Sequence, residues 1–370
     1  LIHRSTLIDR LDQSIQRPVT LVSAPAGYGK TMLVSCWLEA SSIPSAWVSL
    51  DKNDNDAHLF LSYFLSAVRS LFPDACPQTL ATATVSPLPS PPALARNLIN
   101  ELDRIEQPFI LVLDDFHLIK NQFVLDLLTQ LLQHPPHIIN LVLIGRRDPP
   151  LPITKLRSQG LLTEIRTQGL RFSRGETKTF LEQLMGTQID PSTVAALHKK
   201  TEGWVTGLRL AFLSMRHRGN IDPKLLGAQV NAQYVMEYLF VEVFSSQPSE
   251  IRSYLLGTAI LDRFCGPLCE AVRAPGTDAS TCEHSGWDFI AWLKEENLFV
   301  IPLDTENRWF RYHHLFQRLL VNQLKRHCST EEINLLHSRA SGWYAEEGLI
   351  EEALEHALAA GDITGAIQLV

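Results

Sequence analysis

The residues best suited to chemistry form one short segment, Ala24-Pro-Ala-Gly-Tyr-Gly-Lys-Thr31. It follows an apolar run at 19–23 and precedes a stretch with helical periodicity at 31–38, which is the strand, loop and helix context of a P-loop. Glycines in such a loop let backbone N–H groups turn toward phosphate oxygens, and the helix N-terminus adds its positive dipole. The sequence therefore predicts a site for the phosphates of a nucleoside triphosphate.

The individual residues of this segment have distinct expected roles. Lys30 is expected to reach the β and γ phosphates, and Thr31 to ligate Mg²⁺. An ordinary glycine turn, the alternative interpretation, would not require the lysine, the threonine and both flanking elements together. The nucleotide-binding residues predicted here are Gly27, Tyr28, Gly29, Lys30, Thr31 and Met32.

A pair of carboxylates follows a second apolar run, at 109–113. A P-loop needs such an acid at the end of a buried strand to hold the Mg²⁺ shell, and we assign this role to Asp114 together with Thr31. Asp115 is positioned to orient or polarise the attacking water; its alternative is a solvated turn residue. Asp114 and Asp115 are therefore the predicted catalytic residues.

An arginine and a histidine that could contact phosphates also follow apolar segments. Arg146, after the run at 138–144, is favoured over Arg147 as a sensor of the γ-phosphate, against the alternative of a surface arginine in a proline turn. His313 follows a hairpin pattern near the C-terminus. On residue chemistry alone, a histidine on an apolar segment is more often a packed core residue than a ligand.

The elements that must position these residues alternate between strands and helices up to about residue 170. Strands are predicted at 19–23, 45–50, 109–113 and 138–144, and a long helix at 56–71, which indicates a doubly wound parallel sheet. Val85 opens a proline-rich loop. Beyond residue 170 the pattern is helical, with a cap at Ser173 and a helix at 235–244.

A hairpin pattern at 298–303 and 309–312, around the turn 304–307, follows further helices and indicates a winged helix. The tail predicts two short antiparallel helices joined at Gly348, the start of a TPR-like helical repeat. We therefore expect a multidomain α/β and α protein. Its predicted divisions are a P-loop nucleotide-binding domain at 1–170, a helical domain at 171–246, a winged-helix domain at 247–328 and the start of a helical-repeat region at 329–370.

Composition narrows the class of protein. The 370 residues carry a net charge of -7 and are 45% hydrophobic, without a long Lys and Arg cluster, which argues against a nucleic-acid-binding surface in this segment. Neither a membrane span nor a secretory signal is evident, so we expect a cytoplasmic protein. The six scattered cysteines suit reduced thiols. Because the chain starts at Leu1 and stops inside a predicted helix, we expect it to be part of a longer protein.

The order of these motifs resembles that of the STAND class of signal-transduction ATPases, and more narrowly that of the MalT-like, ATP-dependent LuxR-family regulators. The resemblance extends over essentially the whole chain. The residues that carry it are Ala24 to Thr31, Leu113-Asp-Asp-Phe-His117, Arg146, Leu156-Arg157, Leu170-Arg-Phe172, Gly203-Trp204 and Tyr312-His313.

The resemblance implies a signalling ATPase with a slow hydrolysis rate that serves as a timer. In that family an ADP-bound, closed monomer switches to an ATP-bound, self-associating form, and a winged-helix histidine, here His313, touches the phosphates. The resemblance also places Arg4 in the adenine pocket and makes Gly203-Trp204 a contact segment of the helical domain, unless Trp204 is a core anchor. An inducer-binding repeat domain and a DNA-binding C-terminal domain would lie mostly or wholly outside this segment.

Two other classes of protein compete with this interpretation. An ATP-driven AAA-type enzyme or motor would be expected to present an arginine finger to a neighbour and to work as a ring. A nucleotide-independent scaffold would have no need of an intact Lys30, Thr31, Asp114 and Asp115. The helical, hairpin and repeat patterns of the second half of the chain favour a sensor.

Overall fold

The computed structural model of the chain describes residues 2–216, 233–273 and 285–369. It forms two compact units, Leu1–Arg171 and Phe172–Val370, which we describe separately. Among the described residues, no helix has both the length and the apolar character that a bilayer crossing requires. The cysteines in these ranges are free thiols, and Cys282 lies outside them.

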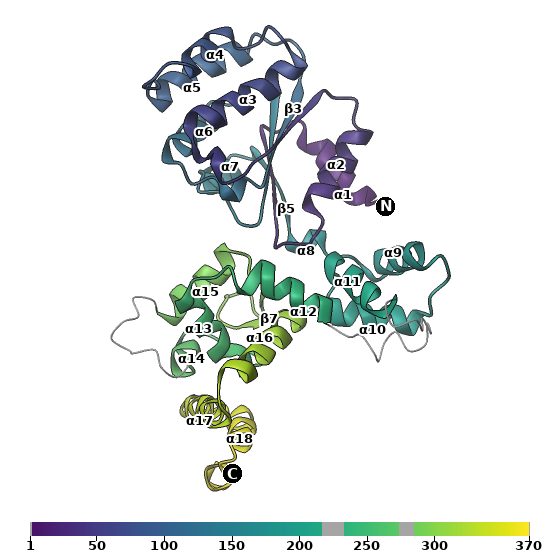
Figure 1. Ribbon diagram of the computed structural model, residues 1–370, viewed down its shortest axis with the longest axis vertical. Helices are drawn as coiled ribbons and strands as arrows, with labels where there is room; N and C mark the ends of the chain where they lie inside the picture. The colour runs from purple at the N-terminus through teal and green to yellow at the C-terminus, as the bar shows by residue number, and fades with distance from the viewer. Residues whose placement is uncertain (1, 217–232, 274–284, 370) are drawn as a thin grey trace. The chain divides into compact units, whose positions relative to one another are not determined.

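The first unit is built around a five-stranded sheet (Figure 1). Its strands are β1 (Val19–Ser23), β2 (Ser45–Ser49), β3 (Phe109–Asp114), β4 (Ile139–Gly145) and β5 (Leu162–Arg166). They pair in the order β2-β3-β4-β1-β5, and every pair is parallel. The apolar runs β1, β3 and β4 are buried along their whole length, as strands covered on both faces must be. The predicted parallel sheet is confirmed.

Helices cover both faces of this sheet, with α1 and α2 on one side and α3 to α6 on the other (Figure 1). Caps fix where several of them begin: the Asp56 side chain accepts the Leu59 N–H, and the Asn121 side chain accepts the Phe123 N–H. The helices are α1 (Ser5–Ser14), α2 (Lys30–Ala40), α3 (Ala57–Leu71), α4 (Pro77–Ala83), α5 (Pro91–Leu102), α6 (Gln122–Gln133), α7 (Ile153–Ser158) and α8 (Thr167–Leu170).

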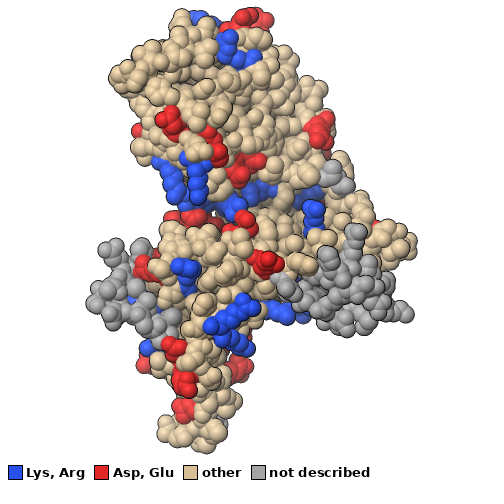
Figure 2. All heavy atoms as spheres, viewed as in Figure 1, with Lys and Arg blue, Asp and Glu red and all other residues tan. Residues whose placement is uncertain are grey.

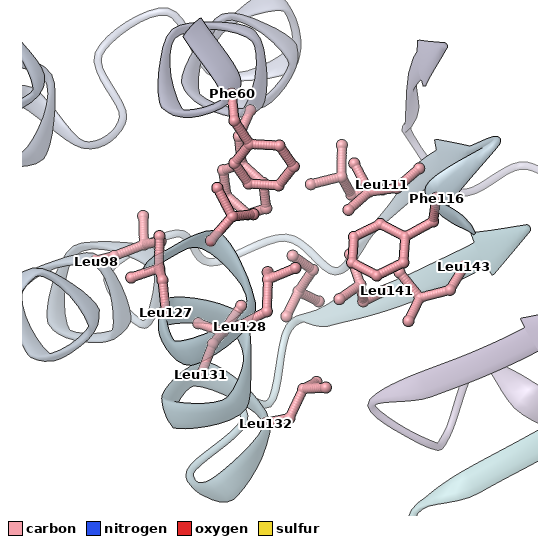
Figure 3. Packing of buried hydrophobic residues seen from close by; sticks show 14 of the residues in the cluster. Phe60, Leu98, Leu111, Phe116, Leu127, Leu128, Leu131, Leu132, Leu141 and Leu143 are labelled. Carbon is pink, nitrogen blue, oxygen red and sulfur yellow. The ribbon is translucent and has the colours of Figure 1, made fainter. Parts of the chain in front are cut away.

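Leucine and phenylalanine side chains of α3, α5 and α6 pack against the sheet (Figure 3). Phe60, Leu98 and Leu128 face Leu111 of β3 and Leu141 of β4, and all five are almost completely buried. Burying one such side chain contributes about 1.5–3 kcal/mol. This packing fixes β3 and β4; Asp114 ends β3, Asp115 follows it, and Arg146 follows β4.

Strand β5 was not predicted. It lies at the edge of the sheet next to β1, and its sequence, Leu-Thr-Glu-Ile-Arg, has only two apolar residues, which are three positions apart. Glu164 and Arg166 are partly exposed there and form an ion pair with each other. A five-residue segment with two charges and neither an apolar run nor a strict alternation gives a weaker signal than the apolar runs of the central strands.

The second unit is mainly helical, and the predicted cap at Ser173 is confirmed as part of a capping box with Glu176. The helix predicted at 235–244 differs in its second half, where residues Phe240–Phe244 form a wider π-helical turn closed by the Ser245 N–H on the Phe240 carbonyl. The helices are α9 (Arg174–Met185), α10 (Pro191–Thr201), α11 (Val205–Arg216), α12 (Gln233–Leu239), α13 (Ser249–Gly257), α14 (Gly266–Ala271), α15 (Gly286–Glu295), α16 (His314–His327), α17 (Thr330–Glu346), α18 (Ile350–Ala359) and α19 (Ile363–Gln368).

The predicted hairpin is confirmed as the antiparallel pair β6 (Val300–Pro302) and β7 (Phe310–Tyr312). Asp304 closes its turn by accepting the N–H groups of Arg308 and Trp309. The apolar tail helices α17 and α18 are joined at Gly348, which has a left-handed φ of 75°.

One basic residue attaches these tail helices to the hairpin. The guanidinium of Arg263 lies 4.5 Å from the centre of the Trp309 ring and forms an ion pair with Glu352 of α18. The Arg263 carbonyl accepts the Tyr344 hydroxyl of α17 at 3.1 Å. The hairpin and the first helix pair are therefore held together within the second unit.

Candidate functional site

The P-loop follows β1 and leads into α2, as its motif requires. Gly27 and Gly29 have φ values of 77° and 78°, a conformation that favours glycine. A Cβ atom on Gly29 would meet nothing within 4 Å, so the backbone conformation and not the available space requires glycine there. Gly29 is also the N-cap of α2, so the loop leads to the positive end of an 11-residue helix.

Lys30 lies over the carbonyl groups of its own loop. Its Nζ donates to the Ala24 carbonyl at 2.8 Å and to the Pro25 carbonyl at 3.0 Å. Burial and then the charge of Arg146 lower the pKa of Lys30 to about 8, although Asp115 and Asp114 act in the opposite direction. Two neutral acceptors are weaker partners for an ammonium group than a phosphate, so Lys30 is prepared to exchange them for an anion.

Thr31 and Asp114, the two predicted Mg²⁺ residues, lie side by side. The Thr31 hydroxyl donates to Oδ2 of Asp114 at 3.0 Å, and Oδ1 accepts the Asp115 N–H at 2.8 Å. Burial raises the pKa of Asp114, and these two hydrogen bonds partly oppose that rise. Both side chains offer the oxygen atoms that Mg²⁺ prefers.

The Thr31 and Asp114 pair suits a metal ion whose remaining ligands come from the nucleotide and from water. Among the described residues, no three His, Cys, Asp or Glu side chains gather as a metal site. Mg²⁺ in nucleotide sites is usually bound by one or two protein oxygens together with waters and phosphate oxygens. Thr31 and Asp114 therefore fit Mg²⁺ that arrives with a nucleotide.

Asp115 turns sharply away from the end of β3, with a left-handed φ of 54°. Its side chain is 52% exposed, and its Oδ1 lies 3.7 Å from Nδ1 of His117. This nitrogen is buried and has no hydrogen-bond partner among the described residues. Burial, then the charges of Arg146 and Lys30, lower the pKa of His117 to about 4, so its ring is neutral at pH 7.

His117 lies beside the predicted site residues, and the sequence analysis included it in a motif without giving it a role. The turn at Asp115 returns the chain so that His117 meets the end of β4: a Cβ on Gly145 would lie 3.5 Å from the His117 Cβ. Arg147 donates to the His117 carbonyl at 3.3 Å. The Asp-x-His spacing was the available signal, but its meaning depends on the left-handed turn.

Arg146 acts electrostatically on this site. Its charge contributes to the lowered pKa of both Lys30 and His117, which places its guanidinium near both side chains. The adjoining Gly145 carbonyl accepts the Ala24 N–H at 3.3 Å and so joins β4 to the start of the P-loop. The structure therefore brings Lys30, Thr31, Asp114, Asp115 and Arg146 to one edge of the sheet.

The remaining predicted residues of the first unit lie in different surroundings. Tyr28 is buried, whereas Met32 is 53% exposed on α2. Arg4 donates to the backbone carbonyls of Leu170 and Arg171 at 2.9 and 3.0 Å, so it ties the N-terminal segment to the last residues of this unit. Its place in an adenine pocket stays a prediction.

His313 belongs to the second unit and is 1% exposed. Its Nδ1 accepts the Leu315 N–H at 3.2 Å, so it carries no hydrogen, and Nε2–H must be the donor to the Thr201 carbonyl at 2.8 Å. Trp204 is completely buried, and its ring lies 5.2 Å from that of Phe299. The structure shows Trp204 as a core anchor.

Comparison with known proteins adds to this geometry. Residues 1–144 match a family model described as an AAA ATPase domain, and residues 240–332 match one described as a MalT winged helix domain. The chain is 32% identical over 362 residues to the HTH-type transcriptional regulator MalT of Yersinia pestis (strain Pestoides F). It is 33% identical over 364 residues to MalT of Serratia proteamaculans (strain 568).

These alignments cover 97% and 98% of this chain but only 39% of each relative, so the chain spans about two-fifths of their length. Among solved structures, a Walker-type ATPase of Pyrococcus abyssi aligns with a TM-score of 0.59 at 15% identity. That alignment covers 86% of this chain and 96% of the other. At this identity the similarity shows the fold alone.

Proposed function

Because this chain belongs with the MalT-like regulators and carries an AAA ATPase domain and a MalT winged-helix domain, we propose that it is the ATP- and ADP-binding switch of a transcriptional regulator. The observation that carries the proposal is the arrangement at the sheet edge. Lys30 lies over the P-loop carbonyls, and Thr31 is hydrogen-bonded to Asp114. This arrangement supports a role in binding phosphates and Mg²⁺.

In the proposed reaction, the Lys30 ammonium leaves the Ala24 and Pro25 carbonyls for the β and γ phosphates. Thr31 and Asp114 would hold Mg²⁺, which neutralises phosphate charge when bound. Asp115, half exposed beside the loop, orients the attacking water, and the neutral His117 ring positions the Asp115 carboxylate. Arg146 contacts the γ-phosphate and distinguishes ATP from ADP.

The switch itself follows from contacts that differ between the two nucleotides. A ligand shifts a conformational equilibrium only through its differential affinity for the two states, and Arg146 supplies such a contact for the γ-phosphate. The ADP-bound form is the closed monomer, and the ATP-bound form is the one that self-associates. Slow hydrolysis of ATP returns the protein to the ADP-bound form. For His313 to contact a phosphate, its Nε2–H must leave the Thr201 carbonyl.

DNA binding and inducer binding are two further activities that we propose for other parts of the regulator. In Figure 2 the basic side chains form small groups interspersed with acidic ones, and most of the visible described surface carries neither. With a net charge of -7, this segment lacks the basic footprint of a DNA-binding surface. We therefore propose that the DNA-binding and inducer-binding parts of the regulator lie outside this segment, and that the protein is cytoplasmic. Within the segment, the proposed domains are the nucleotide-binding domain at 1–170, the helical domain at 171–246, the winged-helix domain at 247–328 and the start of the helical repeat at 329–370.

One experiment tests this function. The nucleotide that copurifies with the chain is identified by chromatography, and the mass in solution is then measured with ADP and with ATP plus Mg²⁺. Retained ADP on a monomer, with a larger mass in ATP, is the expected result. Lys30→Ala should lose nucleotide retention; normal retention by this variant would overturn the site assignment. Equal masses in both nucleotides would contradict the switch.

A further inference from the structure

A short turn of the second unit, residues 201–204, is held by the end of the hairpin. The Arg311 guanidinium donates with Nη1 to Oε1 of Glu202 at 2.9 Å and with Nη2 to Oε2 at 3.1 Å. The His314 N–H, at the start of α16, donates to Oε1 at 3.2 Å. One carboxylate therefore receives a two-point guanidinium contact and a helix N-terminus.

The surroundings of this carboxylate make the contact stronger than a surface ion pair. The side chain of Glu202 is 10% exposed and that of Arg311 is 25% exposed. Burial alone would raise the pKa of Glu202, but the hydrogen bonds from Arg311 and the neighbouring positive charges lower it to about 2. Glu202 is thus ionised at neutral pH, and removing one partner would leave a poorly solvated charge.

The backbone of the 201–204 turn has an unusual conformation at the residue that makes this contact. Glu202 has a left-handed φ of 50° and Gly203 one of 74°, so the chain reverses there between α10 and α11. A left-handed conformation is unfavourable for a residue other than glycine, and the side-chain contacts of Glu202 with Arg311 and the His314 N–H favour it here. The contact with Arg311 therefore holds the turn in the observed shape.

The same turn has contacts on both sides. The Phe172 N–H donates to the Gly203 carbonyl at 2.9 Å, and Phe172 directly follows Arg171, the last residue of the first unit. The Thr201 carbonyl accepts Nε2–H of His313. The turn thus joins the start of the second unit to the hairpin end that carries Arg311 and His313.

We propose that Glu202 and Arg311 form a latch that holds the 201–204 turn against the hairpin end, and that opening this latch is required for the passage from the resting to the self-associating form. This proposal rests on the proposed switch function. With the latch closed, α10 and α16 are fixed together and His313 stays beside Thr201. With it open, the helical segment and the hairpin can separate, and the surfaces between them become available to another copy of the chain.

The test compares Glu202→Gln, which keeps the side chain's shape and removes its charge, with the charge-swapped pair Glu202→Arg with Arg311→Glu. The matched control is Glu306→Gln, in the turn of the same hairpin, where Glu306 and Arg308 are 4.0 Å apart and more than 70% exposed. Two properties are measured on the full chain: hydrogen exchange of the peptide that contains residues 201–204, and the ATP-dependent increase of mass in solution.

We expect Glu202→Gln to speed exchange in this peptide about tenfold and to lower the concentration at which the ATP-bound chain self-associates by a similar factor. The swapped pair should recover much of both changes, and Glu306→Gln should behave like the parent chain. If Glu202→Gln is folded, as shown by its circular dichroism, and both properties stay within twofold of the parent, the latch is disproved.

The two readouts separate this proposal from the function on which it rests. Hydrogen exchange is measured without nucleotide, so it reports the contact even if ATP binding fails. Faster exchange with unchanged self-association would disprove the regulatory role of the latch while leaving nucleotide binding intact. Failure of the parent chain to bind ATP would instead overturn the proposed function.

Discussion

Nδ1 of His117 lies 3.7 Å from Oδ1 of Asp115, on the turn that follows β3. The distance is too long for a hydrogen bond, yet this nitrogen is buried and has no partner among the described residues. A small rotation of the half-exposed Asp115 would form the bond. A buried polar atom without a partner is rare in proteins, and the proposed role of His117 in positioning Asp115 accounts for it.

The first prediction concerns this pair. His117→Asn places an amide N–H near the position of Nδ1, whereas His117→Leu removes the donor, so Asn should keep most of the ATP hydrolysis rate and Leu should lower it at least about tenfold. Single-turnover hydrolysis measures the rate, and ADP titration should show unchanged affinity in both variants. Equal rates for Asn and Leu would show that His117 does not act through a donor at Nδ1.

Acid should destabilise both units through buried histidines. Burial, and then nearby positive charges, lower the pKa of His117 to about 4; burial, and then His337, do the same for His356. Below about pH 6.5 the unfolded chain binds a proton at each of these histidines, whereas the folded chain does so only near pH 4. The free energy of unfolding is therefore highest above pH 6.5. It falls as the pH falls toward 4, by about 2 kcal/mol for each histidine.

Urea unfolding at pH 7 and at pH 4.5 measures this loss. His356→Gln should flatten the pH dependence of the second unit. A second unit whose stability falls as steeply without His356 would refute the assignment.

The lowered pKa of Lys30 predicts that nucleotide binding is linked to the uptake of a proton. Its pKa of about 8 should rise when phosphates replace the loop carbonyls, so binding at pH 8 takes up a fraction of a proton and affinity falls as the pH rises above 8. Calorimetry in two buffers with different ionisation enthalpies measures this uptake. At pH 6.5, where Lys30 is already protonated, the uptake from this source should vanish.

Arg146 and its neighbour Arg147 form a matched pair. If Arg146 contacts the γ-phosphate, Arg146→Ala should weaken ATP binding about tenfold or more and leave ADP binding nearly unchanged. Arg147, which donates to the His117 carbonyl, should show no such difference between the nucleotides when changed to Ala. Equal losses of ATP and ADP affinity in Arg146→Ala would remove its sensor role.

Gly207 is expected to be intolerant of any side chain. A Cβ there would lie 2.4 Å from the buried ring of Trp204, so Gly207→Ala should destabilise the second unit by about 1–3 kcal/mol. Gly342 in α17 has nothing within 4 Å of the same position, and Gly342→Ala should stabilise by about 0.5–1 kcal/mol. Thermal unfolding of the two variants checks both signs.

The sequence was sufficient for the parts of the fold that repeat a local pattern. The continuous apolar runs of β1, β3 and β4, the cap at Ser173 and the hairpin around Asp304 follow from residue types at short spacing. The edge strand β5 escaped prediction because its five residues include two charges and form neither an apolar run nor a strict alternation, and the π-helical turn at 240–244 has no distinct signature.

The site divides in a similar way. Lys30, Thr31 and Asp114 could be assigned because the P-loop motif and the strand end specify them. The closeness of His117 to Asp115 depends on a left-handed turn at a residue other than glycine, and the bond between Arg311 and Glu202 joins residues 109 positions apart. Only the folded chain shows such contacts.

The attachment of Arg263 to Trp309, Tyr344 and Glu352 has a mechanical consequence. Trp309 directly precedes β7, the strand that carries Arg311, so α17 and α18 are connected to the latch by a few rigid contacts. A force that displaces these helices would therefore reach, through Arg263 and Trp309, the strand that carries Arg311.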